Sequence, residues 1–157
     1  MEKKKTKNNM ELWNKVSVTN PAHTKKVGFG ANLTSVCAQQ QIKMATMQFG
    51  PMGSDWGVRG EEFNIIEKWL CIYYKATLYY PGGEIEIHSD IQIAPKTKNK
   101  PEGKYNEDWS KKLATDALTK GLSKLGFNSD IFEGKFDDNK YVEDATNFFN
   151  NQNGGQS

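Results

Sequence analysis

Few residues of this 157-residue sequence have the types and spacing that catalysis requires. The two histidines, His23 and His88, stand in no evident arrangement of a nucleophile and its base. Cys37 and Cys71 lack the paired spacing of a zinc site, and each lies in an apolar pattern, so we expect two buried free thiols. No Walker A motif is present. We therefore predict no catalytic residues, no metal site and no cofactor, in a protein that is not an enzyme.

A group of acidic residues after the last predicted helix keeps one enzymatic alternative open. Asp130, Glu133, Asp137 and Asp138 lie close together in sequence, and clustered carboxylates can hold the metal ions of a nuclease. Their spacing lacks the alternation of an EF-hand loop, and loop acids are more often simply solvated. A metal-dependent nuclease is therefore a less favoured alternative.

The basic residues are more informative, because the net charge of +2 is distributed in blocks. Residues 1–44 carry eight lysines against two acids, and residues 92–124 carry eight lysines against four. The segments 45–91 and 125–157 are each net acidic. If the fold joins the two basic blocks, they form a positive surface that favours a polyanion.

Aromatic residues interleave with these blocks, as they do in proteins that bind single strands by stacking bases on rings. Trp56, Tyr73, Tyr79 and Tyr105 could supply such rings, although each ring taken alone more often belongs to a core or an interface. No finger, homeodomain or ribonucleoprotein motif is present. The pattern favours binding led by the phosphate backbone over sequence-specific readout.

Two strands with a period of two must position these residues. Alternate residues from Leu70 to Tyr80 share an apolar face, and so do the isoleucines of the segment 84–93. Pro81-Gly82-Gly83 between them predicts a hairpin. The segment 56–66 predicts a third strand, because an isolated hairpin is marginally stable in water. The isoleucine face requires a cover, most simply helices.

Two helices are predicted to flank these strands, over 33–49 and 108–125, from apolar residues at helical spacing. Asn106 or Asp108 can cap the second helix. The lysine-rich segment 95–104 before it has no apolar periodicity, so we expect a mobile basic loop. The predicted fold class is α+β, with a β-β-β-α core whose antiparallel three-stranded sheet is packed by helices.

The ends of the chain are polar. We expect a flexible basic arm over 1–10, a single folded domain over 11–143, and a disordered polar tail over 144–157. No apolar run reaches the length of a membrane span, and no apolar signal core follows the basic start. We therefore expect no membrane association and no secretion.

Two segments resemble a known family. One runs from Thr24-Lys-Lys-Val-Gly-Phe-Gly-Ala-Asn-Leu-Thr-Ser-Val to Ala45-Thr-Met-Gln-Phe-Gly-Pro-Met-Gly-Ser-Asp-Trp-Gly57. The other is Lys111-Lys-Leu-Ala-Thr-Asp-Ala-Leu-Thr-Lys-Gly-Leu-Ser-Lys-Leu-Gly126 with Asp130-Ile-Phe-Glu-Gly-Lys-Phe-Asp-Asp-Asn-Lys-Tyr141. Both resemble phage single-strand annealing proteins of the Rad-fifty-two-like (Sak-type) superfamily, and the second segment resembles that family's signature helix.

The resemblance implies rings or filaments of identical subunits that anneal complementary strands without ATP, in the cytoplasm of an infected bacterial host. It implies that single-stranded DNA is held by its backbone in a basic groove lined by the signature helix. The family's basic pair falls on Thr119 and Lys120, so only Lys120 is basic here. A groove arginine would align near Gln40, and Asp55 stands where the family has glycine. Other phage or host recombination and replication proteins are expected as partners.

These arguments predict a protein of phage homologous recombination that binds and anneals single-stranded DNA. The alternatives are a protein that protects single strands without annealing them, the nuclease, and a protein-interaction module. The DNA-binding residues that we predict are basic side chains of both blocks and of the strand between them, namely Lys25, Lys26, Lys43, Arg59, Lys96, Lys98, Lys100, Lys104, Lys112, Lys120 and Lys124.

Overall fold

The computed structural model describes residues 8–28 and 33–154, which divide into two compact units. The sheet unit is Ala45–Leu122, and the terminal unit combines Met1–Met44 with Ser123–Ser157. That residues 11–143 form a single folded domain stays a prediction. Most of the predicted flexible arm, residues 1–7, lies outside the described residues.

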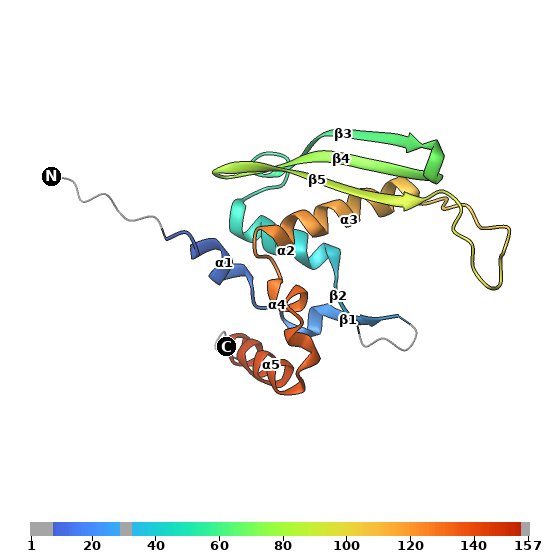
Figure 1. Ribbon diagram of the computed structural model, residues 1–157. Helices are drawn as coiled ribbons and strands as arrows, with labels where there is room; N and C mark the ends of the chain where they lie inside the picture. The colour runs from blue at the N-terminus through green and yellow to red at the C-terminus, as the bar shows by residue number, and fades with distance from the viewer. Residues whose placement is uncertain (1–7, 29–32, 155–157) are drawn as a thin grey trace. The chain divides into compact units, whose positions relative to one another are not determined.

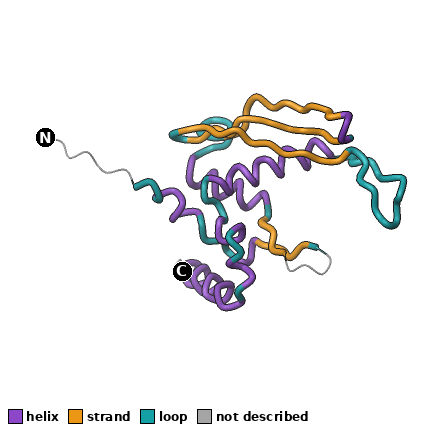
Figure 2. Tube along the Cα trace, viewed as in Figure 1, coloured by secondary structure: helices purple, strands orange, loops and turns teal. Residues whose placement is uncertain are grey.

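A three-stranded antiparallel sheet is the framework of the sheet unit (Figures 1 and 2). Strands β3 (Gly57–Ile66), β4 (Cys71–Tyr80) and β5 (Gly83–Gln92) lie in the order β3-β4-β5, and the 3-10 helix η2 (Glu67–Trp69) follows β3. Pro81 and Gly82 join β4 to β5, so the predicted hairpin and the predicted third strand are both confirmed.

Helix α3 (Trp109–Lys124) runs along one face of this sheet (Figure 1). On the face of β4 toward this helix, Ile72, Tyr74, Ala76 and Leu78 are buried, and they are among the alternate residues predicted to share a face. A Cβ placed on Gly121 would lie 2.5 Å from Cγ2 of Ile87, so the helix backbone approaches β5 closely. The helix covers the isoleucine face, and the predicted α+β class with a helix-packed sheet is confirmed.

The terminal unit is built mostly from short helices around a small two-stranded ribbon. In the ribbon, β1 (Thr24–Val27) pairs antiparallel with β2 (Leu33–Val36). The helical elements are α1 (Glu11–Val16), η1 (Pro21–His23), the first part of α2 (Ala38–Phe49), α4 (Ser129–Phe132), η3 (Lys135–Asp137) and α5 (Asn139–Asn153).

A buried carboxylate joins distant segments of the terminal unit. Asp130 is 2% exposed. It accepts hydrogen bonds from the backbone N–H of Thr19 at 2.7 Å and from the Tyr141 hydroxyl at 2.8 Å. The Thr19 hydroxyl donates to its other oxygen. Buried charge is tolerated only where hydrogen bonds compensate its lost hydration, so Asp130 fixes these segments together.

The first predicted helix begins later than expected. Residues 33–36 form β2, and α2 begins at Ala38. Residues Leu33–Val36 pair with Thr24–Val27 as strands. This pairing outweighs the helical spacing of their apolar residues, from which a helix was predicted. Cys37 donates its backbone N–H to His23 and is exposed, so the prediction that it is buried was wrong, whereas Cys71 is buried as predicted.

The predicted disordered tail is largely a helix. Helix α5 extends to Asn153, so the prediction was wrong for residues 144–153, and residues 155–157 lie outside the described residues. Asp138 caps the helix by accepting the backbone N–H of Lys140. Ala145 is 5% exposed, and the rings of Phe148 and Phe149 meet edge to face. The helix was not predicted because its few apolar residues stand among many asparagines, a composition typical of disorder.

Candidate nucleic-acid interface

The lysine-rich loop between β5 and α3 is folded by backbone hydrogen bonds. Thr97 and Lys100 each donate to the other's carbonyl at 3.1 Å, and Lys104 donates to Pro95. Gly103, with a φ of +86°, lies so close to Ala94 that an added Cβ would be 2.7 Å from its carbonyl oxygen. The predicted loop is therefore present, with a defined turn at 97–100.

Asn106 attaches the end of this loop to the sheet. Its backbone N–H donates to the carbonyl of Ile93 at 3.0 Å, and its side-chain N–H donates to the carbonyl of Gln92 at 2.6 Å. The remaining amide oxygen accepts from the Lys112 Nζ at 3.1 Å. The Asn106 side chain, expected as a helix cap, instead orients a lysine of α3 against the loop.

A hollow with a volume of 380 Å³ lies between this loop and the start of α3. Three of the predicted DNA-binding residues line it together, namely Lys100, Lys104 and Lys112. Tyr105, which also lines it, is 73% exposed. The polar groups of Thr97, Asn99 and Asn106 complete much of the lining. We call this feature the basic hollow.

The lining of the basic hollow carries both positive and negative charges, with the positive charges in excess, so it favours an anion. Its three lysines share the lining with Glu107 and Asp108. Ammonium groups spaced around a concave surface can neutralise neighbouring phosphates, and an exposed ring beside them can stack a base. The arrangement matches the needs of a flexible nucleic-acid strand, which presents phosphate and base within one nucleotide.

The other predicted residues of the sheet unit do not line the hollow. Lys96 and Lys98 are exposed on the same loop. Arg59 forms an ion pair with Glu84 and lies over the ring of Tyr79, and Lys120 forms an ion pair with Asp116 at 2.7 Å. The charges of Arg59 and Lys120 are thus partly offset within the protein.

The outer face of the sheet is less suited to a polyanion. Glu84, Glu86 and Asp90 are exposed along β5, where they face the same side as Lys75 and its ion-pair partner Glu62. The hydrogen bond from Lys75 to Glu62 raises the pKa of Lys75 above its ordinary value. Because acids outnumber bases on this face, phosphates would be repelled there.

Four predicted residues belong to the terminal unit. Lys25 and Lys26 are exposed on β1, where the Lys26 Nζ donates to the Thr34 hydroxyl at 2.8 Å. Lys43 on α2 and Lys124 at the end of α3 are exposed as well. They form a second set of basic side chains within the chain.

The predicted aromatic platforms have different environments. Trp56 is 0% exposed, and its indole N–H donates to the carbonyl of Gly50 at 3.0 Å, so it is a core residue. Tyr73 stacks with His88 on the outer face of the sheet, and Tyr79 lies beneath Arg59. Tyr105 lines the basic hollow together with its three lysines.

Three of the four acids proposed for nuclease chemistry have structural partners. Asp130 is buried among hydrogen bonds, Glu133 forms an ion pair with Lys135 at 2.7 Å, and Asp138 caps α5. The hydrogen bond from Lys135 lowers the pKa of Glu133 below its ordinary value. Within the part of the chain that the structure describes, no three His, Cys, Asp or Glu side chains gather to hold a metal ion.

Comparison with known proteins adds no assignment. No family model and no curated protein matches this chain. Among the helices of residues 8–28 and 33–154, none has the length and apolar character needed to cross a membrane.

Two residues that shape the basic hollow were not predicted as site residues. Gly103 allows the close approach of the loop to Ala94, and Asn106 orients Lys112. The sequence offered a signal for the first, since Pro101-Glu-Gly103 has the composition of a turn. The contact of Asn106 with Gln92 depends on tertiary structure, and from its position in the sequence Asn106 could be predicted only as a helix cap.

Proposed function

We propose that this protein binds single-stranded DNA through its phosphate backbone and anneals complementary strands without a nucleotide cofactor. The observation that carries the proposal is the basic hollow, where Lys100, Lys104 and Lys112 lie beside the exposed ring of Tyr105. The resemblance of the α3 sequence to the signature helix of Sak-type annealing proteins supports the same conclusion. The proposal places the protein in phage homologous recombination.

Annealing is a task of electrostatics rather than bond chemistry. Two complementary strands repel each other through their phosphates, so a protein that neutralises phosphates lowers the barrier to their encounter. Contacts to phosphate position the strand and leave the base edges available for pairing. Lysines suit this role, because an ammonium group on a flexible stem can follow a moving backbone.

The proposed assembly is a homo-oligomer, in which repeated hollows extend the contact along one strand. Strand β3 is an edge of the sheet, and the residues at its end are apolar and open to solvent. Ile65, Trp69 and Leu70 are each about two-thirds exposed, and Phe63 is 41% exposed. An edge strand beside exposed apolar side chains invites pairing with a second copy of the chain.

The salt dependence of oligonucleotide binding tests the DNA-binding part of the proposal. Each phosphate neutralised on a single strand contributes about −0.7 to the slope of log K against log salt. The double variant Lys104→Ala with Lys112→Ala is therefore expected to make the slope shallower by about 1.4. Fluorescence anisotropy with a labelled thymidine oligonucleotide over a salt series measures this slope.

Lys111→Ala is the matched control for this experiment. Lys111 is exposed, neighbours Lys112 on α3 and carries the same charge, but it does not line the hollow. The control variant should keep the slope of the parent protein within error. An unchanged slope in the double variant would remove the basic hollow from the DNA-binding site.

A second experiment separates annealing from protection of single strands. Two complementary oligonucleotides carrying a fluorophore and a quencher are mixed with the protein in the absence of nucleotide. An annealing protein speeds their pairing, whereas a protein that only protects single strands slows it. Incubation with magnesium or manganese tests the nuclease alternative, for which cleavage products of labelled DNA are the decisive result.

A further inference from the structure

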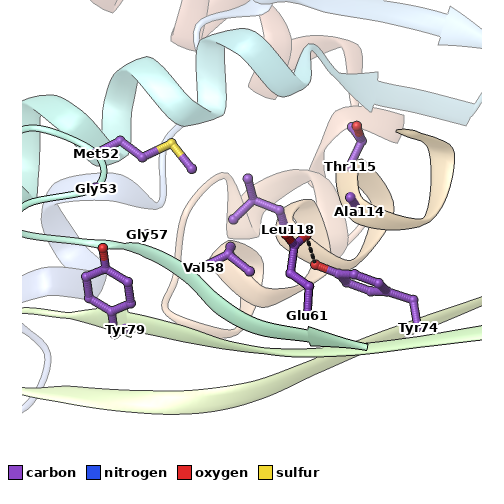
Figure 3. Close-up of a pocket in the computed structure, with 10 residues that line it drawn as sticks. All are labelled: Met52, Gly53, Gly57, Val58, Glu61, Tyr74, Tyr79, Ala114, Thr115 and Leu118. Atoms are coloured by element: carbon purple, nitrogen blue, oxygen red, sulfur yellow. Dashed lines mark hydrogen bonds between the residues drawn. The ribbon is translucent and has the colours of Figure 1, made fainter. Parts of the chain in front are cut away.

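A second hollow in the sheet unit has a different chemistry from the basic hollow. It has a volume of 330 Å³ and is formed by the loop after α2, by β3 and β4, and by α3 (Figure 3). Its apolar walls include Met52, Val58 and Leu118, and its lining contains no lysine or arginine. A pocket of this kind does not suit a phosphate group. Its dimensions fall in the range of small-molecule sites.

A β-bulge in β3 brings a carboxylate into this pocket. The register of β3 against β4 shifts between Arg59 and Glu62, and Gly60 there has a φ of +65°. The extra residue turns Glu61 toward α3, on the same side of the sheet as Val58, while Glu62 pairs with Lys75 on the outer face. Bulges of this type re-aim side chains and are frequent beside functional sites.

The Glu61 carboxylate is held as a hydrogen-bond acceptor at the polar end of the pocket. The Tyr74 hydroxyl donates to its Oε1 at 2.8 Å, and Tyr74 itself is 1% exposed (Figure 3). Burial, together with the hydrogen bond to Glu61, raises the pKa of Tyr74 above its ordinary value, so its hydroxyl remains a donor. Glu61 keeps further lone pairs on both oxygens for a ligand that carries N–H groups.

The rest of the pocket suits a flat ring. Figure 3 shows Val58 and Leu118 between Met52 on one side and the Glu61–Tyr74 pair on the other. Gly53 has no atom within 4 Å of the position that a Cβ would occupy, so the backbone of the loop is open at this point. Met52 is 46% exposed, and thioethers pack well against aromatic rings.

We propose that this pocket accepts one unpaired base of the bound strand and prefers guanine, while the neighbouring bases, held only through their phosphates, keep their edges available for pairing. The inference rests on the proposed function, since it names which base the DNA-binding protein reads. Guanine presents the N1–H and the N2 amino group side by side, and a carboxylate accepts both. Adenine and cytosine each offer a single exocyclic amine beside an acceptor, and the N3–H of thymine lies between two carbonyl oxygens. The carboxylate therefore discriminates between bases that the apolar walls would treat alike.

The test compares oligonucleotides that differ in one base. A thymidine oligonucleotide and the same oligonucleotide with isolated guanines are titrated by fluorescence anisotropy. A third replaces each guanine with inosine, which keeps the N1–H and lacks the N2 amine. We expect the guanine-containing strand to bind about tenfold more tightly than the thymidine strand, since two hydrogen bonds to a base edge typically discriminate to that extent. Inosine should lose most of this gain without any change to the protein.

Two protein variants complete the test. Glu61→Gln retains an acceptor for Tyr74 and replaces a carboxylate oxygen with a donor, so it should abolish the preference for guanine. Glu62→Gln is the matched control, because this adjacent acid lies on the outer face with Lys75. It should keep the preference. Melting temperatures of both variants verify that they are folded.

Each other outcome overturns the proposal. Equal binding of the guanine and thymidine strands would show that the pocket reads no base, although the proposed function would stand. Loss of self-association in Glu61→Gln with the base preference intact would assign the pocket to a basic side chain of a second copy. If no oligonucleotide binds, the proposed function itself fails, and this inference fails with it.

Discussion

At the residue scale, the chain separates acids that stabilise the fold from those that face solvent or ligand. Asp130 is buried and accepts hydrogen bonds from Thr19, Ile131 and Tyr141, whereas Glu61 carries one such bond and remains exposed. Asp130 was predicted to act together with the neighbouring acids, because its position in the sequence does not indicate that it is buried. The lysines of the hollow were predictable from composition, but their selection from eleven candidates required the loop to be folded.

The Tyr141–Asp130 hydrogen bond predicts a dependence of stability on alkaline pH. Burial, and then the hydrogen bond to Asp130, raises the pKa of Tyr141 above its ordinary value. Above about pH 10 the unfolded chain releases this proton while the folded chain retains it, so the free energy of unfolding falls as pH rises. Below that pH the group contributes no pH dependence.

Tyr141→Phe tests this dependence in urea titrations at pH 9 and pH 11. The variant is expected to be less stable at pH 9, because it lacks the hydrogen bond, and to lose less stability between the two values. A loss between pH 9 and pH 11 as large as that of the parent protein would contradict the assignment.

At the element scale, the sequence pattern was sufficient to predict an element where its period matched the contacts that the element makes. The hairpin of β4 and β5 and the stripe of α3 were predictable, because their periods of two and 3.6 agree with what they contact. Strand β2 was not predictable, since its four residues form a strand only through their pairing with β1. Helix α5 was missed because a cap at Asp138 and a few apolar contacts outweigh a polar composition.

The loop between β5 and α3 carries a prediction of its own. In Gly103→Ala the new Cβ would lie 2.7 Å from the carbonyl oxygen of Ala94, at a φ that disfavours alanine, so the loop must rearrange. Loss of Lys100 and Lys104 from the hollow would make the salt slope of DNA binding shallower, by up to about 1.4.

Gly82→Ala is the control for backbone strain alone. Gly82 also has a positive φ, of +100°, but lies in the turn between β4 and β5 with no atom within 4 Å of a Cβ. This variant should keep the parent slope. A similar change in both variants would mean that the Gly103 effect is not specific to the loop.

At the scale of the whole molecule, the exposed apolar end of β3 predicts self-association. Ile65→Lys places a charge among Phe63, Trp69 and Leu70, and should convert the oligomer into smaller species by multi-angle light scattering. Leu33→Lys is the control, since Leu33 is an aliphatic strand residue that is 61% exposed outside this group. A parent protein that is already monomeric would contradict the proposed assembly.

The rate at which two complementary oligonucleotides pair is the most direct test of the proposed function. With no nucleotide present, the protein is expected to accelerate pairing at low salt, and the Lys104→Ala, Lys112→Ala variant should lose most of the acceleration. Pairing that is unchanged or slowed by the parent protein would contradict the claim that this chain anneals DNA.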